Sequence, residues 1–416
     1  MLTLIKCHIF KQKEGFVMYK LYCRIYQSVF KLVSHVLPWR KPELIQGVNS
    51  LNKLPRLIKS KGINSVLIVT DRVIASLGLM DGLLKGLNDE GVDFVVYDKT
   101  VQNPTIDNIE EALLMYKANN CHGIVAFGGG SPMDCAKGVG ARVARPKKSI
   151  SQMKGVFKVM KKIPPLFAIP TTSGTGSETT IAAVITDSRT HEKYAINDTS
   201  LIPAYAVLDP VLTANLPPHI TSTTGIDALT HAVEAYIGRS NTKETIKYSR
   251  EVVTLIFENI FEAYSNGKNL AAREKMQKAS FLAGLAFTRA YVGNVHAIAH
   301  TLGGFYSVPH GLANAIILPY VLEYYGKSAH KPLAELADLI GLSVPGDTSE
   351  QKAVKFIEAI KKLNKSMEIP NKVNGIVESD IPLMVKRAFS EANPLYPVPK
   401  IMSKEDIMSI YYSIKE

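Results

Sequence analysis

The sequence has few of the features that mark secreted or membrane-spanning proteins. Its 416 residues include only four cysteines, without CxxC spacing, which argues against a disulfide framework and fits reduced thiols. No run approaches the roughly 20 uninterrupted apolar residues of a membrane-spanning helix, and no signal peptide with a small-residue cleavage site is evident. Hydrophobic residues make up 46% of the chain. The composition therefore predicts a globular, cytoplasmic protein of two domains.

Acidic residues are scarce at the start of the chain. Residues 1 to 41 carry eight Lys or Arg against Glu14 alone, which is +7 of the formal charge of +12 and leaves +5 for the other 375 residues. A nucleic-acid enzyme would be expected to carry a basic face with interleaved aromatics in its folded domain. The sequence shows no such stretch, so we expect no nucleic-acid partner.

The same region predicts an amphipathic helix. From Met18 to Leu37, apolar residues recur at helical spacing and polar residues occupy the other side. Such a helix can pack on the protein body or on a partner subunit, or it can lie on a membrane surface. We treat residues 1–42 as an extension of the main fold.

From about residue 43, short apolar runs alternate with helical stretches, as in βαβ units of a mostly parallel sheet. Beyond Pro217 the strand-like runs disappear, and long amphipathic helices follow at 242–264, 270–289 and 352–364. The pattern predicts an α/β domain over 43–215 and an all-helical domain over 216–416. The candidate strands are 65–70, 93–97, 123–127, 166–169 and 206–208.

A glycine-rich turn, Gly128-Gly-Gly-Ser-Pro-Met-Asp134, follows the strand at 123–127. Ser131 is expected to cap a helix, with Pro132 in its first position. The helix start then offers unpaired amides and the positive end of the helix dipole. The turn predicts a phosphate or pyrophosphate site, although it is not the GxGxxG fingerprint, and a tight connection that binds nothing is the alternative.

Three further features suit a dinucleotide. The segment Pro170 to Glu178, PTTSGTGSE, is rich in hydroxyls and glycine; a capped connection is the alternative. Asp71 ends the strand at 65–70, where a carboxylate can bind ribose hydroxyls and repel a 2′-phosphate, which favours NAD over NADP. A simple helix N-cap is the other interpretation of Asp71. Lys193 can reach a cofactor oxygen or stay solvated.

Histidines gather in the second half of the chain. Asp227 and His231 are four residues apart in a predicted helix, as are His296 and His300, and His310 lies beside a proline and a glycine at a predicted turn. So many imidazoles among small and apolar residues need a shared partner. One carboxylate with several imidazoles suits a divalent cation such as Fe²⁺ or Zn²⁺.

In this order, the motifs resemble those of the iron-containing, or group III, alcohol dehydrogenases. The resemblance covers roughly residues 43 to 416. It implies a Rossmann-like N-terminal domain, a helical C-terminal domain (a dehydroquinate synthase-like architecture), a metal ion and a homodimer. Residues 1–42 depart from the family pattern. The motifs are Gly128–Asp134, Pro170–Glu178, Leu208–Pro210, Gly225–Glu234, His296–Gly304 and Pro309–Gly311.

Transferred position by position, the resemblance implies specific roles. It places the ligands of Fe²⁺, with Zn²⁺ as the alternative, on Asp227, His231, His296 and His310. His300 matches the histidine that the family keeps beside the nicotinamide and the substrate. Its NAD contacts fall on Asp71, Gly128, Gly129, Gly130, Ser131, Asp134, Thr171, Thr172, Thr175 and Lys193.

The expected reaction is reversible hydride transfer between NAD(H) and a primary alcohol or aldehyde. A related hydroxy-acid or polyol dehydrogenase, of the 4-hydroxybutyrate or glycerol type, is the runner-up. No basic residue lies directly beside the metal motifs to hold a carboxylate, and Arg289 is near enough to keep this alternative open. A catalytically silent scaffold recruited by its N-terminal helix is a third hypothesis. Phe287 and Tyr291 either wall an apolar substrate pocket or pack in the core.

Overall fold

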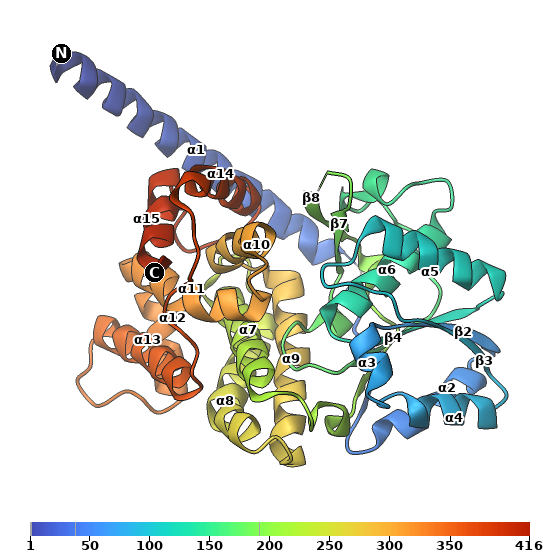
Figure 1. Cartoon of the computed structure of the whole chain (residues 1–416). Helices are drawn as coiled ribbons and strands as arrows, with labels where there is room; N and C mark the ends of the chain where they lie inside the picture. Colours follow the sequence, from blue (N-terminus) through green and yellow to red (C-terminus); the bar gives the residue numbers. More distant parts are fainter. Residues whose placement is uncertain (1, 38, 191) are drawn as a thin grey trace. The chain divides into compact units, whose positions relative to one another are not determined.

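A computed structural model describes residues 2–37, 39–190 and 192–416, and for residues 2–14, 35 and 36 it describes the backbone alone (Figure 1). An α/β unit comprises Pro38–Ala228 and Glu258–Thr288, and a helical unit comprises Met1–Leu37, Leu229–Phe257 and Arg289–Glu416. The units do not follow a single cut in the sequence, so the domain limits at residues 42 and 215 stay predictions. The helices that continue from one unit into the other are α7 (Pro218–Ile237), α8 (Lys243–Ser265) and α9 (Leu270–Ala290).

A six-stranded parallel sheet forms the centre of the α/β unit, in the order β1-β9-β6-β4-β2-β3. All five predicted strands are present, which confirms the Rossmann-like fold class. The edge strand β1, with the sequence ELIQ, was not predicted, because polar residues at both of its ends leave only two apolar residues in a row. The strands are β1 (Glu43–Gln46), β2 (Ser65–Val69), β3 (Asp93–Tyr97), β4 (Gly123–Gly128), β6 (Leu166–Pro170) and β9 (Tyr205–Leu208).

The central strands are apolar throughout because both faces of the sheet are covered. Alternate residues point to opposite faces: Ile124 and Ala126 belong to one core cluster, and Val125 and Phe127 to the other. Helices lie on both sides of the sheet (Figure 1). They are α5 (Ile106–Ala118) and α6 (Gly130–Ala144) on one side and α2 (Leu54–Ser60) and α4 (Asp81–Asp89) on the other.

A second, three-stranded sheet of the α/β unit was not predicted. Its order is β5 (Gly155–Val156), β8 (Glu192–Asn197) and β7 (Ala182–Asp187), and β7 and β8 form an antiparallel pair. Polar and charged residues interrupt β8, and β5 has only two residues, so neither shows the apolar run by which the strands of the main sheet were recognised. The strand β7 does begin with such a run, Ala-Ala-Val-Ile, and the prediction missed it. The position of β8 matters because it carries Lys193.

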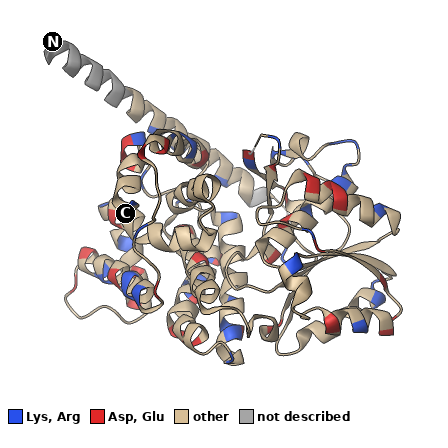
Figure 2. Ribbon diagram, in the orientation of Figure 1, with Lys and Arg blue, Asp and Glu red and all other residues tan. Residues whose placement is uncertain are grey.

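The described residues that follow α7 form helices and no strand, apart from an isolated bridge between Val373 and Lys415. This confirms the predicted helical C-terminal region. The helices predicted at 242–264, 270–289 and 352–364 correspond to α8, α9 and α13. Basic and acidic side chains are intermixed on α13 (Figure 2). The later helices are α10 (Asn294–Tyr306), α11 (His310–Tyr325), α12 (His330–Leu339), α13 (Ser349–Ser366), α14 (Ile381–Ala392) and α15 (Lys404–Ile414).

The predicted N-terminal helix, α1, spans Leu2–Val36 and so begins well before Met18. One face packs on the helical unit and buries Cys23 and Gln27. The apolar side chains of Met18, Leu21, Ile25, Val29 and Leu32 are exposed along the other side. Within the described part of the chain, no helix combines the length and apolar character that crossing a membrane requires.

Candidate active site

Three neighbouring strands bring the predicted cofactor segments to one edge of the main sheet. Val69 of β2 lies opposite Ala126 of β4, and Gly128 of β4 lies opposite Pro170 of β6. The residues that follow these strands therefore leave the sheet side by side at its carboxyl edge. This edge is where open α/β sheets bind their ligands. It carries Asp71, the glycine turn and the PTTSGTGSE segment.

Neighbouring side chains lie so close to the glycine turn that Gly128 and Gly130 have little room for a Cβ. Gly128 has φ +145°, and a Cβ built on it would lie 2.7 Å from Cγ of Pro132. A Cβ on Gly130 would lie 3.2 Å from Cγ2 of Thr175. The prediction that Ser131 caps the helix is wrong: α6 begins at Gly130, and Gly129 is in the cap position with an extended backbone (φ −80°). The Ser131 hydroxyl instead accepts a hydrogen bond from the Asn103 amide at 3.3 Å.

The hydroxyl-rich segment is held against this turn. The Thr171 amide donates to the Gly128 carbonyl at 3.1 Å, and the Thr172 side chain lies 3.6 Å from a Cβ built on Gly129. Thr171 is buried, whereas Thr172 and Thr175 keep some exposure. The structure thus brings all three threonines to the glycine turn.

A buried lysine, Lys137, fixes the end of this segment and was missed by the sequence reasoning. Its Nζ donates to the carbonyls of Ser177, Thr180 and Ala182 at 2.8 to 3.0 Å, and to the hydroxyls of Ser177 and Thr180. Burial lowers the pKa of Lys137 to about 8. Burial likewise raises the pKa of Asp134 to about 6 and that of Glu178 to about 7, although Lys137 opposes both shifts.

Asp71 and Lys193 both have protein partners. Asp71 is the N-cap of α3 (Arg72–Ser76), and its Oδ1 accepts from the Ile74 amide at 2.9 Å. The structure therefore confirms that Asp71 caps a helix, and a contact between Asp71 and a ribose remains a prediction. Lys193 Nζ donates to Asn103 Oδ1 at 2.7 Å. Asn103 adopts a left-handed φ of 58° and connects Lys193 to Ser131, a link that sequence spacing could not reveal.

The second group of predicted residues forms one compact cluster. One ligand atom from each of Asp227, His231, His296 and His310 lies within 4.8 Å of all the others. Asp227, His231 and His296 are buried, and His310 is partly exposed. The prediction that His310 lies at a turn is wrong in one respect, because His310 is the first residue of the helix α11. Pro309 is in the cap position before it.

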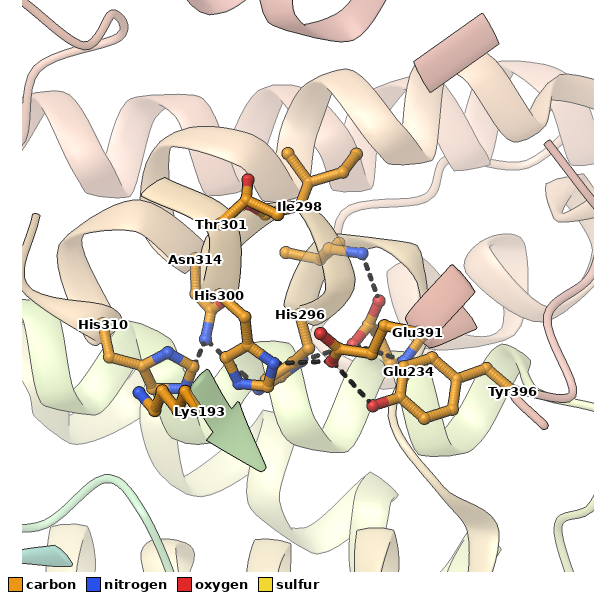
Figure 3. Close-up of polar contacts among 12 residues, drawn as sticks. Lys193, Glu234, His296, Ile298, His300, Thr301, His310, Asn314, Glu391 and Tyr396 are labelled. Carbon is orange, nitrogen blue, oxygen red and sulfur yellow. Dashed lines mark hydrogen bonds and ion pairs between the residues drawn. The ribbon is translucent and has the colours of Figure 1, made fainter. Parts of the chain in front are cut away.

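Glu234 orients the imidazole of His296. Its Oε2 lies 2.6 Å from His296 Nδ1 (Figure 3), and a carboxylate accepts, so Nδ1 carries the proton and Nε2 keeps its lone pair. Asn314 Nδ2 lies 3.2 Å from Nε2 of both His296 and His310. The lone pairs of two imidazoles therefore point toward one positively polarised group.

The chemistry of these donors fits a cation. Burial, reinforced by the neighbouring His231, His310 and His300, lowers the pKa of His296 well below its usual value, so the ring stays neutral and can act as a ligand. Three imidazoles and one carboxylate suit Fe²⁺ or Zn²⁺. Glu234 supplies the support that metal-bound histidines commonly have. It lies on the same helix face as Asp227 and His231, at i, i+4 and i+7, so the sequence did contain a signal for it.

His300 faces a different acid. Its Nδ1 lies 2.6 Å from Glu391 Oε1, and the Tyr396 hydroxyl donates to the same oxygen at 2.9 Å (Figure 3). The acceptor fixes the proton on Nδ1 and leaves Nε2 as the exchangeable nitrogen. The sequence did not reveal Glu391 or Tyr396, because they lie 91 and 96 residues after His300.

The residues considered for a substrate carboxylate and an apolar pocket have other contacts. Arg289 Nη1 lies 2.6 Å from Glu244 Oε2, in a partly exposed ion pair. The ring of Tyr291 meets Phe30 of α1 edge-on, with centroids 6.0 Å apart. These contacts favour core packing for Tyr291 and occupy Arg289 with an acid of the protein itself.

A parallel α/β sheet with a glycine turn at its carboxyl edge, together with a buried Asp/His cluster, is the arrangement expected of a dehydrogenase that combines a dinucleotide with a metal ion. Two family models match the chain: "Iron-containing alcohol dehydrogenase" over residues 41–210 and "Fe-containing alcohol dehydrogenase family, C-terminal" over 221–414. The chain belongs to the iron-containing alcohol dehydrogenase family. It is an alcohol dehydrogenase, an oxidoreductase that acts on CH–OH donors.

Individual relatives agree with this assignment. The chain is 38% identical to alcohol dehydrogenase 4 of Saccharomyces cerevisiae over 88% of its length and 94% of that protein. It is 35% identical to the NAD-dependent methanol dehydrogenase of Bacillus methanolicus, over 89% of this chain and 97% of that protein. The crystal structure of a 1,3-propanediol oxidoreductase superposes with a TM-score of 0.87 at 34% identity, over 91% of this chain and 99% of that one.

Proposed function

We propose that this alcohol dehydrogenase binds Fe²⁺ through Asp227, His231, His296 and His310, and that Zn²⁺ can take its place. The observation that carries the proposal is the convergence of four donor groups within 4.8 Å in a largely buried setting. A cation held there supplies a Lewis acid for the substrate oxygen.

The cofactor proposed for this enzyme is NAD(H). The glycine turn, Gly128 to Ser131, offers a helix start to the pyrophosphate. The proposed contacts to the rest of the cofactor are Thr171, Thr172, Thr175, Asp134 and Lys193, and the side chains of Thr172 and Thr175 lie beside the turn. Asp71 favours a free ribose 2′-hydroxyl over a 2′-phosphate, because a phosphate would meet its negative charge.

His300 is proposed as the catalytic proton carrier. Because Glu391 accepts from Nδ1, Nε2 is the atom that can take a proton from an alcohol or return it to an aldehyde. Positioned acid–base groups contribute about 10²- to 10⁴-fold to a rate. The proposed substrates are small primary alcohols and their aldehydes, consistent with the alcohols in the names of the relatives.

The assembly and location of the enzyme remain predictions: a cytoplasmic homodimer with no nucleic-acid partner. The exposed apolar side chains of α1 support a contact of residues 18–37 with a second subunit or a membrane surface.

The test combines metal analysis with turnover. Protein reconstituted separately with Fe²⁺ and Zn²⁺ is assayed for NADH oxidation with an aldehyde panel and for NAD reduction with the matching alcohols. We expect activity to follow metal content. Simple aldehydes without a charged group should be better substrates than four-carbon aldehydes that carry a carboxylate. Full activity of the metal-free protein would overturn the proposal.

A further inference from the structure

The N-terminal helix α1 binds a segment without regular secondary structure that follows α14. Gln27 is buried, and its Nε2 donates to the carbonyls of Pro394 and Tyr396 at 3.0 and 2.8 Å. Because Nε2 of this buried amide donates to two carbonyls, the Gln27 side chain restrains the backbone of residues 394–396.

Arg24, one turn earlier on α1, extends this contact. Its Nη1 donates to the Val398 carbonyl at 2.8 Å, and its Nη2 donates to the Pro399 carbonyl at 3.1 Å. Nη1 also donates to Gln27 Oε1 at 2.8 Å. Burial lowers the pKa of Arg24 to about 10, so the guanidinium is still charged at neutral pH. Two linked side chains of α1 therefore satisfy four carbonyls of residues 394–399.

A ring contact fixes the other end of the same region. Tyr19 of α1 stacks on Phe389 of α14 with ring centroids 5.5 Å apart. Phe389 lies two residues before Glu391, the acid that binds His300. The helix thus contacts the chain on both sides of Glu391, and the Tyr396 hydroxyl in the clamped segment donates to Glu391.

We propose that α1 is a positioning element for catalysis. Gln27 and Arg24 hold the main chain of residues 394–399, so that Tyr396 keeps Glu391 against Nδ1 of His300. The family match begins at residue 41, so α1 is an addition of this chain to the shared fold. This inference rests on the proposed role of His300.

The experiment is a double-mutant cycle on the Fe²⁺-loaded enzyme, with NAD and 1,3-propanediol. Gln27→Leu removes both carbonyl contacts, and Tyr396→Phe removes the hydroxyl that holds Glu391. Each should lower kcat roughly 10-fold, part of the 10²- to 10⁴-fold that acid–base catalysis contributes, while KM for both substrates and the iron content change little. The double variant should fall no lower than the worse single variant, because both changes act through one contact.

A second readout does not depend on activity. Hydrogen exchange of residues 389–399 should quicken in Gln27→Leu and stay slow in Ser28→Ala. Ser28 is a matched control on α1, since its hydroxyl is exposed and donates to the Arg24 carbonyl within the helix. If Gln27→Leu does not fold, Arg24→Lys, which keeps the charge but loses the forked contact, replaces it in the cycle with the same expectation.

The outcomes separate this inference from the proposed function. His300→Ala in the same assay should lose at least as much kcat as the double variant, and full turnover of His300→Ala would reject the role of His300 and this inference together. Loss of kcat in His300→Ala with normal kcat in Gln27→Leu and Tyr396→Phe would overturn the positioning role alone. Effects that multiply to roughly 100-fold in the double variant would also overturn it, since independent contacts add in free energy.

Discussion

Replacing Glu234 with glutamine should weaken metal binding, although Glu234 is not among the four proposed ligands. Its Oε2 accepts from the Gly293 amide at 2.8 Å and lies 2.6 Å from His296 Nδ1, and its Oε1 accepts from the Val295 amide at 2.8 Å. Both carboxylate oxygens are therefore acceptors. Glutamine has only one oxygen, so its NH₂ group must face at least one N–H donor.

The glutamine oxygen is expected to take the place of Oε2, which has two donors, so the NH₂ group faces the Val295 amide and His296 Nδ1 keeps only a neutral acceptor. The magnitude follows from the loss of the negative charge in the bond to His296 and from the broken contact with Val295. A hydrogen bond to a charged group contributes about 1.5 to 3 kcal/mol, and each 1.4 kcal/mol is about a tenfold change in an equilibrium constant. The Kd for Fe²⁺ or Zn²⁺ should therefore rise by about 10- to 100-fold, which is also the usual effect of removing a carboxylate that supports a metal-bound imidazole.

Titration of the metal-free protein against a competing chelator measures this Kd. Glu335→Gln is the matched control, because Glu335 Oε2 accepts from the Tyr236 hydroxyl at 2.7 Å and the substitution leaves Glu234 in place. Circular dichroism checks that both variants are folded. An unchanged Kd in folded Glu234→Gln protein would refute the argument that Glu234 orients a metal ligand.

Asp227→Ala or His310→Ala should abolish metal retention and turnover together, measured by metal analysis and NADH oxidation; full activity in metal-depleted His310→Ala would reject the site. The kcat/KM should be higher for NADH than for NADPH, and a strong preference for NADPH would show that Asp71 is misassigned. Lys137→Met should lower the free energy of unfolding in urea by about 3 to 5 kcal/mol, because it leaves buried acids and carbonyls without their cation; a change below about 1 kcal/mol would contradict this. Burial raises the pKa of Glu178 from 4.5 to about 7. Between these two values the folded state keeps a proton that the unfolded chain releases, so the free energy of unfolding should fall as the pH rises from about 4.5 to about 7. Glu178→Gln should flatten that slope in thermal melts at several pH values, and an unaltered slope would count against it.

The elements predicted well are those whose pattern is set by burial. The central strands are apolar on both faces, so they stand out as short uninterrupted runs, and α8, α9 and α13 show the helical period. The strand β8 mixes polar and apolar residues, β5 has two residues, and β1 has polar residues at both ends, so none of the three shows a pattern that separates it from a loop. The cap of α6 was misassigned because glycine caps through its backbone and leaves no side-chain signature.

The candidate site shows the same division. Spacing along one helix could place Asp227 near His231, and the family resemblance could place His296 and His310. Partners that meet only through the fold could not be found this way. Glu391 reaches His300 from α14, Asn103 joins Lys193 to Ser131, and Lys137 ties three separate carbonyls, all through contacts between residues distant in sequence.

Asp71 has a consequence for redesign. Its Oδ1 accepts a hydrogen bond from the Ile74 amide in the first turn of α3. A substitution of Asp71 that admits NADP therefore also affects the start of that helix. Alanine would remove the repulsion and the cap at once, at a cost of about 0.5 to 2 kcal/mol. Serine or asparagine removes the negative charge but still accepts from that amide. An engineered change of coenzyme preference at this position should therefore pass through one of these two residues.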